Sequence, residues 1–421
     1  MRFMTGITTR EHRITVDWDR DNPQLGTLEI FARELSRDDS LPFLLYLQGG
    51  PGFPSPRPVS IDGWLNKALQ THRVVLLDQR GTGRSGRIDR FGEPVTAEHL
   101  KHLRASDIVA DAEALRRHLG VEQWDLLGQS FGGFCITAYL SQASSSVRYA
   151  FLTGGLPATG VHADEVYRAT YQQLARRHQE FYEEVECAEQ RVRELCHHLD
   201  NAQELLPTGE RLSSRRLRTI GIDLGRGTGI ADLAALLESP FHTVQGEKRL
   251  RGDFLSEINA RVSFESAPLY AVIHESIYGG VAPGATNWSA HRMREEIPGF
   301  EENADPLHAE QFYLTGEHIF PWQFEEDPAL RPFAAVAEEL ALVDDWSNPY
   351  DLANLEAAET SCAAAAYPDD CFVPINYSLE TASHFGDIDV WQAAEYHHNG
   401  LRQDGERIFG ELLSRVNYPG R

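Results

Sequence analysis

This sequence has very little lysine, no long apolar run and no net positive charge. Lys67, Lys101 and Lys248 are its only lysines among 421 residues, and the formal net charge is −24. Nucleic acids and anionic membranes bind basic surfaces, so this charge argues against both as partners. No stretch approaches the length of a membrane span, and residues 1–17 contain no apolar segment of a secretory leader. We therefore expect a soluble, cytoplasmic protein.

Cysteine is scarce as well. The five cysteines are scattered and odd in number, which predicts free thiols in a reducing compartment rather than a disulfide framework. Cys196-His197-His198 has the residue types of metal ligands, but it lies in a charged helical pattern without a second ligand pair at a useful spacing. We interpret it as a helix surface in solvent and predict no metal site.

Strand-like and helix-like segments alternate along the first 157 residues. Residues 12–18 and 26–32 alternate apolar and polar, as in an antiparallel hairpin at a sheet edge. The other candidate strands are more continuously apolar, as in buried strands, and lie at 41–47, 74–77, 124–127, 149–155, 311–315, 362–367 and 390–396. With helical patterns between them, they predict a mostly parallel, doubly wound α/β sheet.

Residues 158–308 lack this strand pattern. The segment is helical in period, most clearly over 164–199, and it is too long to be a loop. We predict a helical cap domain at 158–308, inserted into a core domain formed by residues 1–157 and 309–421.

Ser130 lies in a strand-to-helix turn with glycine two positions away on either side, at Gly128 and Gly132. As a bare pattern G-x-S-x-G is weak evidence, but this context is the one that a nucleophilic serine at a sheet edge requires. The helix that follows points its amide end at any oxyanion formed there.

A serine nucleophile needs a base and an acid that orients the base. Asp369 and Asp370 follow the strand at 362–367, and His397 and His398 follow the last predicted strand. Each pair alone is more typical of an ordinary turn. Their joint order after Ser130 is that of an α/β-hydrolase triad and favours catalysis, although order does not choose within either pair.

Several motifs resemble those of the proline iminopeptidases, serine peptidases of the α/β-hydrolase fold. Residues 48–52 (QGGPG) resemble the family's H-G-G-P-G loop, 78–85 (DQRGTGRS) its D-Q-R-G-x-G-x-S, and 128–133 its nucleophile turn. Residues 395–402 are similar to the E-Y-x-H-x-G-L-R of longer members. The resemblance spans most of the chain and is weakest over 158–260. Gln48 replaces a histidine of short members, and we expect little loss because backbone amides do the work.

The resemblance implies a role for each motif residue. Ser130 is the nucleophile, His398 the base and Asp370 the acid, since Pro374 stands four positions after it as in the family. The amides of Gly50 and Phe131 form the oxyanion hole.

A charged substrate N-terminus needs carboxylates beside it. In the family glutamates supply them, and Glu275 and Glu317 stand in matching contexts. Tyr278 and Trp322, with Phe131, are candidates to line a pocket for a pyrrolidine ring, although core packing is the commoner role for each aromatic residue taken singly.

The implied function is a serine aminopeptidase that releases N-terminal proline, with other small residues as further candidates, through an acyl-enzyme and without metal or organic cofactor. Its partners are then small peptides with a free N-terminus, and the oligomeric state stays open. The alternative is an esterase or lactonase of the same fold. A non-catalytic binding protein is less favoured, because no triad member is missing.

Overall fold

An eight-stranded sheet organises the computed structural model, which describes residues 6–416 and 418–419. The strands run in the order β1-β2-β4-β3-β5-β6-β9-β10. β2 pairs antiparallel with both β1 and β4, and all the other neighbouring strands pair in parallel. Their bounds are β1 (Thr8–Asp17), β2 (Thr27–Ser36), β3 (Phe43–Leu47), β4 (Arg73–Leu77), β5 (Trp124–Gln129), β6 (Val147–Thr153), β9 (Ser361–Ala366) and β10 (Ile388–Gln392). The predicted α/β class and edge hairpin are confirmed.

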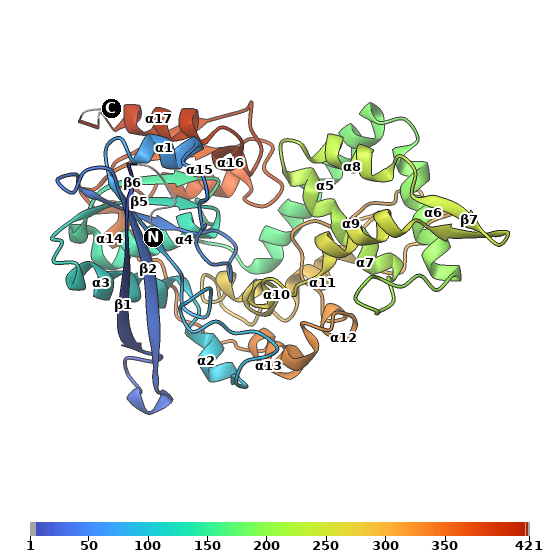
Figure 1. The fold of residues 1–421 in the computed structure, drawn as a ribbon, viewed down its shortest axis with the longest axis horizontal. Coiled ribbons are helices and arrows are strands. Elements are labelled where there is room, and N and C mark those ends of the chain that lie inside the picture. The colour runs from blue at the N-terminus through green and yellow to red at the C-terminus, as the bar shows by residue number, and fades with distance from the viewer. Residues whose placement is uncertain (1–5, 417, 420–421) are drawn as a thin grey trace.

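Helices cover both faces of this sheet (Figure 1). The helices of the sheet domain are α1 (Gly63–Ala68), α2 (Ala97–Lys101), α3 (Ala105–His118), α4 (Phe131–Ala143), α14 (Leu352–Glu356), α15 (Ile375–Ala382), α16 (Gly400–Gln403) and α17 (Gly405–Arg415). Leu126 on the central strand β5 packs with the α3 and α4 side, whereas Leu127 packs with the α1 and α17 side. Successive strand residues point to opposite faces, so one apolar strand serves two cores.

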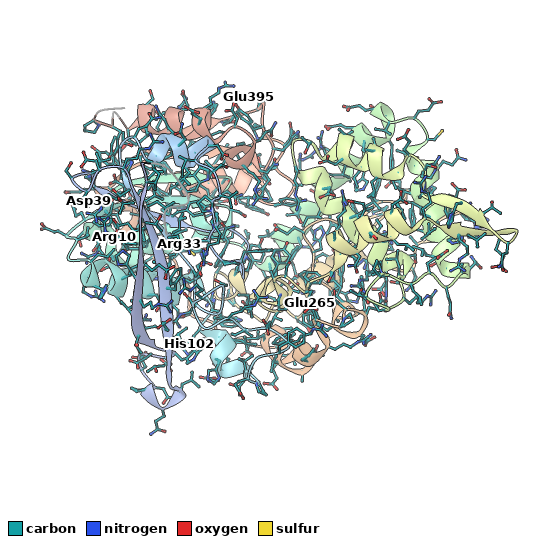
Figure 2. All side chains as sticks on the ribbon, in the orientation of Figure 1. Arg10, Arg33, Asp39, His102, Glu265 and Glu395 are labelled. Carbon is teal, nitrogen blue, oxygen red and sulfur yellow. The ribbon has the colours of Figure 1, made fainter. Side chains whose placement is uncertain are left out.

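The outer strand β1 is protected by charge. Arg10 donates hydrogen bonds to Glu34 on β2 and to Asp39, both at 2.9 Å, and Figure 2 shows Arg10 and Asp39 together at this edge. Ion pairs along an edge strand discourage pairing with another chain.

A second, mostly helical lobe lies beside the carboxyl ends of the parallel strands (Figure 1). It is built from the chain between β6 and β9, which adds no strand to the main sheet. Its elements are α5 (Ala163–Glu184), α6 (Ala188–Asn201), α7 (Ser214–Arg218), α8 (Gly229–Leu237), β7 (Phe241–Val244), β8 (Glu247–Leu250), α9 (Gly252–Val262), α10 (Pro268–Ile273), α11 (Ser289–Arg294), α12 (Gln323–Glu326) and α13 (Ala334–Ala341). The small β7–β8 hairpin was not predicted. Among the described residues, none of the helices is long and apolar enough to cross a membrane.

The strand predicted at 311–315 is wrong. This segment is extended and mostly buried, but it joins no sheet. Arg218 donates to the carbonyl of Tyr313 at 2.8 Å, Tyr182 donates to that of Phe312 at 2.7 Å, and the amide of Leu314 donates to His178 at 3.0 Å. Side chains of the helical lobe therefore satisfy backbone groups that a neighbouring strand would otherwise pair.

This correction bears on the predicted domain boundary. The end of the cap at residue 308 depended on the strand at 311–315, whereas the main sheet resumes only with β9. The division into 158–308 and a flanking core stays a prediction.

Replacing Arg218 should destabilise the protein strongly. Its guanidinium also donates to the carbonyls of Glu301 and Gly299. Arg218→Met therefore removes three charged donors, and it leaves the Tyr313 carbonyl without the Arg218 hydrogen bond. We expect the free energy of unfolding in urea to fall by about 3 kcal/mol. Arg168→Met is the matched control, because Arg168 pairs with Glu296 at the surface, and its loss should stay near ~0.5 kcal/mol. Equal losses in the two variants would contradict this account.

Candidate active site

Ser130 occupies a strained turn between β5 and α4. Its backbone has φ 55° and ψ −125°, a left-handed conformation that residues with a Cβ rarely adopt. The turn is held from both sides, because the Ser130 amide donates to Thr153 at 3.0 Å and the Ser130 carbonyl accepts from Gly133 at 2.7 Å. The sharp turn projects the hydroxyl at the carboxyl edge of the sheet.

The flanking glycines are required by close backbone approach. A Cβ on Gly132 would lie 2.0 Å from the carbonyl oxygen of Leu47 at the end of β3, and one on Gly128 would lie 2.4 Å from that of Gly132. No other residue fits there, so β3, β5 and α4 meet at this turn only with glycine at both positions.

Asp370 follows β9 and His398 follows β10, and their side chains form a buried pair. His398 Nδ1 lies 2.8 Å from Asp370 Oδ2, and the other carboxylate oxygen accepts the amides of Phe372 at 2.8 Å and Val373 at 3.0 Å. Burial lowers the pKa of His398, but the charge and hydrogen bond of Asp370 outweigh it and leave that pKa above its usual value. Asp370 thus orients the ring and stabilises its protonated form.

The geometry favours one member of each predicted pair. Asp369 is exposed, while Asp370 is 2% exposed and bonded to the imidazole. Nδ1 of His397 is buried without a hydrogen-bond partner among the described residues, and burial lowers the pKa of that ring. Asp370 and His398 are therefore the better candidates.

The imidazole lies beside the serine turn. Its Nε2 is 3.4 Å from Nε2 of Gln129, the residue before Ser130. A Cβ on Gly154, next to the residue that holds the Ser130 amide, would lie 3.3 Å from His398 Nδ1. Within residues 6–416 no hydrogen bond joins Ser130 Oγ to the ring. Catalytic bonds of this kind often tighten only when substrate binds.

Two backbone amides are candidates to bind an oxyanion. Phe131 begins α4, so its N–H has no acceptor within the helix, and the helix dipole adds positive potential. Gly50 has φ 132° in the loop after β3, and Gln79 steadies that loop by donating to the carbonyl of Gln48 at 3.0 Å.

The remaining residues of the 78–85 motif build the scaffold of these loops. Asp78 accepts the backbone amides of Ser55 at 3.1 Å and Arg84 at 2.9 Å. The buried Arg80 forms a two-point ion pair with Asp111, with both contacts at 2.7 Å. Asp78 and Arg80 therefore hold these loops in place.

Glu317 and Glu275 are the two carboxylates predicted to bind a substrate amine. Glu317 Oε1 accepts from Tyr270 at 2.8 Å, and burial raises its pKa to about 7 against the opposing charge of His398. Glu275 Oε1 accepts the amide of Ala290 at 2.9 Å, whereas its Oε2 is buried with no hydrogen-bond partner in the described chain. Burial raises the pKa of Glu275 as well.

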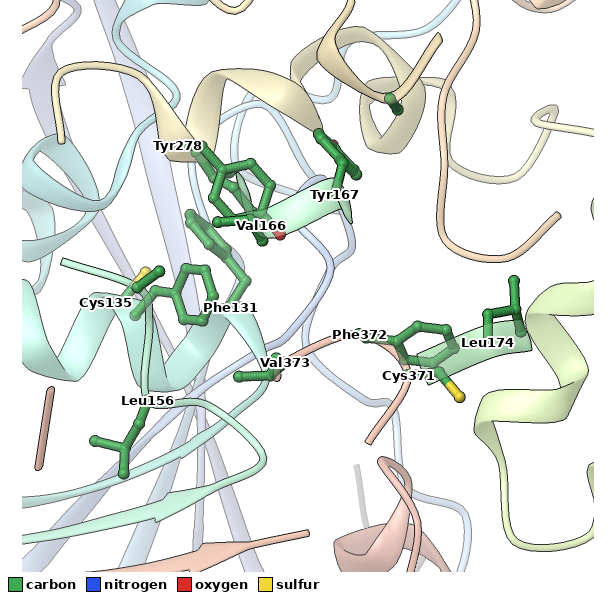
Figure 3. Packing of buried hydrophobic residues seen from close by; sticks show 14 of the residues in the cluster. Phe131, Cys135, Leu156, Val166, Tyr167, Leu174, Tyr278, Cys371, Phe372 and Val373 are labelled. Carbon is green, nitrogen blue, oxygen red and sulfur yellow. The ribbon is translucent and has the colours of Figure 1, made fainter. Parts of the chain in front are cut away.

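Aromatic rings gather between these carboxylates and α4. Tyr278 makes edge contacts with Phe134 at 6.3 Å and with Tyr167 of α5 at 5.6 Å. Figure 3 shows Phe131, Tyr278 and Tyr167 together at the junction of the two lobes. Sequence reasoning missed Tyr167 and Tyr270. The 3.6-residue period of α5 indicates that Tyr167 is buried, but no local signal names its partners.

Trp322 is the predicted pocket residue that the structure does not bring to this cluster. It stacks on Phe320 at 5.6 Å beneath the Arg215 guanidinium at 4.7 Å. None of the contacts described for residues 6–416 joins it to Ser130, Glu275 or Glu317, and its position indicates core packing.

The suspected metal ligands do not converge. Cys196 is buried in the core of the helical lobe, contrary to a fully solvent-facing surface, while His197 is exposed and His198 binds Glu204 at 2.8 Å. Elsewhere in the described chain, Asp19, Glu98 and His102 have ligand atoms within 4.8 Å of one another. Such clusters are common on acidic surfaces and do not by themselves make a site.

Comparison with known proteins covers nearly the whole chain. The family model for the alpha/beta hydrolase fold matches residues 42–235. A proline iminopeptidase of Aeromonas sobria is 41% identical over 98% of this chain and 97% of its own length. One of Aspergillus aculeatus is 29% identical over 96% and 93%. The crystal structure of a proline iminopeptidase from Mycobacterium smegmatis has 14% identity and a TM-score of 0.46, over 96% of this chain and 98% of that one.

Replacing Asp370 and Asp369 by asparagine, one at a time, distinguishes the catalytic aspartate from a surface aspartate. Asp370→Asn keeps the shape of the side chain but loses the charge that orients and stabilises the imidazolium, so we expect kcat to fall about 10³- to 10⁴-fold. Asp369→Asn, in the same turn but exposed, should stay within about twofold of the wild type. The kcat of each variant is measured by steady-state kinetics on a chromogenic amide. The reverse ranking would assign the acid to Asp369.

Proposed function

Because this chain belongs to the proline iminopeptidase family of α/β-hydrolase fold enzymes, we propose that it is a serine aminopeptidase that releases N-terminal proline from peptides. The observation that carries the proposal is the placement of Glu317. The charges of both His398 and Asp370 act on its carboxylate, which supports a role for Glu317 in binding the substrate amine near the candidate base and acid.

The candidate triad accounts for the chemistry. His398 takes the proton of Ser130, and Ser130 Oγ attacks the carbonyl carbon of the N-terminal residue. The oxyanion accepts hydrogen bonds from the amides of Phe131 and Gly50. The imidazolium gives its proton to the departing peptide amine, and water then releases proline from the acyl-enzyme by the same route.

The two glutamates account for the N-terminal residue. The protonated nitrogen of an N-terminal proline carries two N–H bonds. Glu275 offers it a buried oxygen without a protein donor, and Glu317 offers a carboxylate that accepts from Tyr270. Binding the ammonium there compensates the cost of holding one buried and one partly buried carboxylate. The rings of Tyr278 and Phe131 give the pyrrolidine an apolar surface.

The setting of the enzyme is part of the same proposal. Its substrates are small peptides with a free N-terminus, and its location is cytoplasmic. The net charge of −24 supports the absence of nucleic acid and membrane partners.

A panel of aminoacyl p-nitroanilides tests this function. We expect the proline amide to be turned over fastest, N-acetylproline amide at least about 100-fold more slowly, and Ser130→Ala to lose about 10⁴-fold or more in kcat on every substrate. The N-acetyl compound is the matched control, because it removes only the ammonium. Equal rates with free and acetylated amines would favour an esterase or lactonase, and full activity of Ser130→Ala would refute the mechanism.

The pH dependence of kcat/KM should reveal the protonation of Glu317. Below its pKa of about 7 the carboxyl is neutral and no longer attracts the ammonium, and below the pKa of His398 the base is protonated. Both losses act in the same direction, so kcat/KM for the proline amide should fall towards acid with a limiting slope near 2 in a log plot. p-Nitrophenyl acetate, which has no amine, should give a slope near 1. In Glu317→Gln the proline amide should also give a slope near 1, and an unchanged slope would contradict this role.

A further inference from the structure

One loop of the helical lobe touches the segment that carries His398. The backbone amide of Gly227, between the 3-10 turn that ends at Gly225 and helix α8, donates to Asn399 Oδ1 at 2.9 Å. Asn399 directly follows His398 and precedes α16. The contact therefore joins the helical lobe to the residue next to the candidate base.

The same loop reaches His398 through a second path. A Cβ on Gly225 would lie 2.2 Å from Cζ of Phe372, so the glycine backbone is in direct contact with that ring. The ring of Phe372 meets the imidazole of His398 edge-on, with centroids 4.8 Å apart. Figure 3 shows Phe372 extending from the core towards Leu174 on α5. The imidazole is thus backed by a ring that the helical lobe holds in place.

The loop is itself firmly anchored. Arg177 on α5 donates to the carbonyl of Leu224 at 3.1 Å, and Arg261 on α9 donates to Asp223 at 3.1 Å. The amide of Gly229 closes the turn by donating to Arg226 at 3.0 Å. A segment fixed to two helices can serve as a rigid support.

The carbonyls of His397 and Asn399 accept backbone amides from Gly400 at 3.0 Å and Arg402 at 2.9 Å, whereas the carbonyl of His398 itself is reached only by a long contact among the described residues. The side chain of Gln129 reaches the His398 carbonyl at 3.5 Å, which is the outer limit of a hydrogen bond. Asp370 fixes the Nδ1 side of the ring, but it does not fix the backbone that carries it.

We propose that Asn399 and Gly225 are positioning residues, through which the helical lobe sets the orientation of His398 towards Ser130. The proposal rests on the proposed function, in which His398 is the base. Proton transfer demands placement within a few tenths of an ångström, so loosening this support costs rate without removing any reacting group. The amine pocket lies on other residues and is left intact.

Two variants on opposite sides of the contact test it. Asn399→Ala removes the acceptor, and Gly225→Ala pushes on the Phe372 ring. For each we expect kcat on proline p-nitroanilide, and the rate of labelling by a fluorophosphonate serine probe, to fall about tenfold. KM should change less than about twofold. Asn201→Ala and Gly252→Ala are the matched controls: Asn201 bonds only within α6, and a Cβ on Gly252 meets no atom within 4 Å. Both should match the wild type.

Asn399→Asp separates positioning from general damage. It keeps an oxygen acceptor for the Gly227 amide, so kcat at pH 9 should recover to within about threefold of the wild type. Its added negative charge favours the imidazolium and should shift the acid limb of the pH profile to higher pH. Wild-type kcat in both Asn399→Ala and Gly225→Ala would overturn the proposal, as would a rise in KM alone or failure of Asn399→Asp to recover. Full activity of Ser130→Ala would instead refute the proposed function.

Discussion

The close approach of β3, β5 and α4 at the serine turn is the constraint on which the rest of the site depends. Ser130 holds a left-handed backbone because Thr153 and Gly133 bind its amide and carbonyl. Strain of this kind costs about 1–3 kcal/mol and persists only where surrounding structure over-determines it. The loop that carries Gly50 approaches the same turn, because a Cβ on Gly49 would lie 3.0 Å from Cβ of Ser130. The proposed oxyanion site therefore needs only backbone amides and no side chain of its own.

The charges of the candidate site then divide it into two parts. On the core side, the carboxylate of Asp370 raises the pKa of His398. On the side of the helical lobe, burial raises the pKa of Glu275 and Glu317, which lack basic hydrogen-bond partners. Two unpaired acids are costly unless a cation arrives. A charged amine supplies that cation, whereas a neutral ester leaves the cost in place. In the proposed function, the same carboxylates therefore disfavour the alternative substrate class and attract peptides with a free N-terminus.

How much the sequence could predict depended on whether the signal was local. The sheet class, the serine turn and the order of acid and base were readable, because glycine spacing and strand periodicity are properties of short segments. The extended run at 311–315 was recognised as extended, but its partners are Arg218, Tyr182 and His178 from distant helices. The contact of Tyr270 with Glu317 was missed for the same reason. Trp322 had the right chemistry and lies elsewhere, since aromatic character alone does not say which core a ring fills.

The chain order also explains how chemistry and specificity are combined. Ser130 precedes the helical lobe and Asp370 follows it, so the triad closes only when the chain between β6 and β9 brings its ends together. Lengthening such a connection costs little, because closure entropy rises by about 0.6 kcal/mol for each doubling. A large insertion is therefore tolerated between strands that remain neighbours, as β6 and β9 do. The insertion supplies Glu275 with the rings of Tyr167 and Tyr278, while the sheet domain supplies the candidate nucleophile and base. Because the inserted lobe also contacts the segment that carries His398, changes in the substrate-binding part are not independent of the catalytic part.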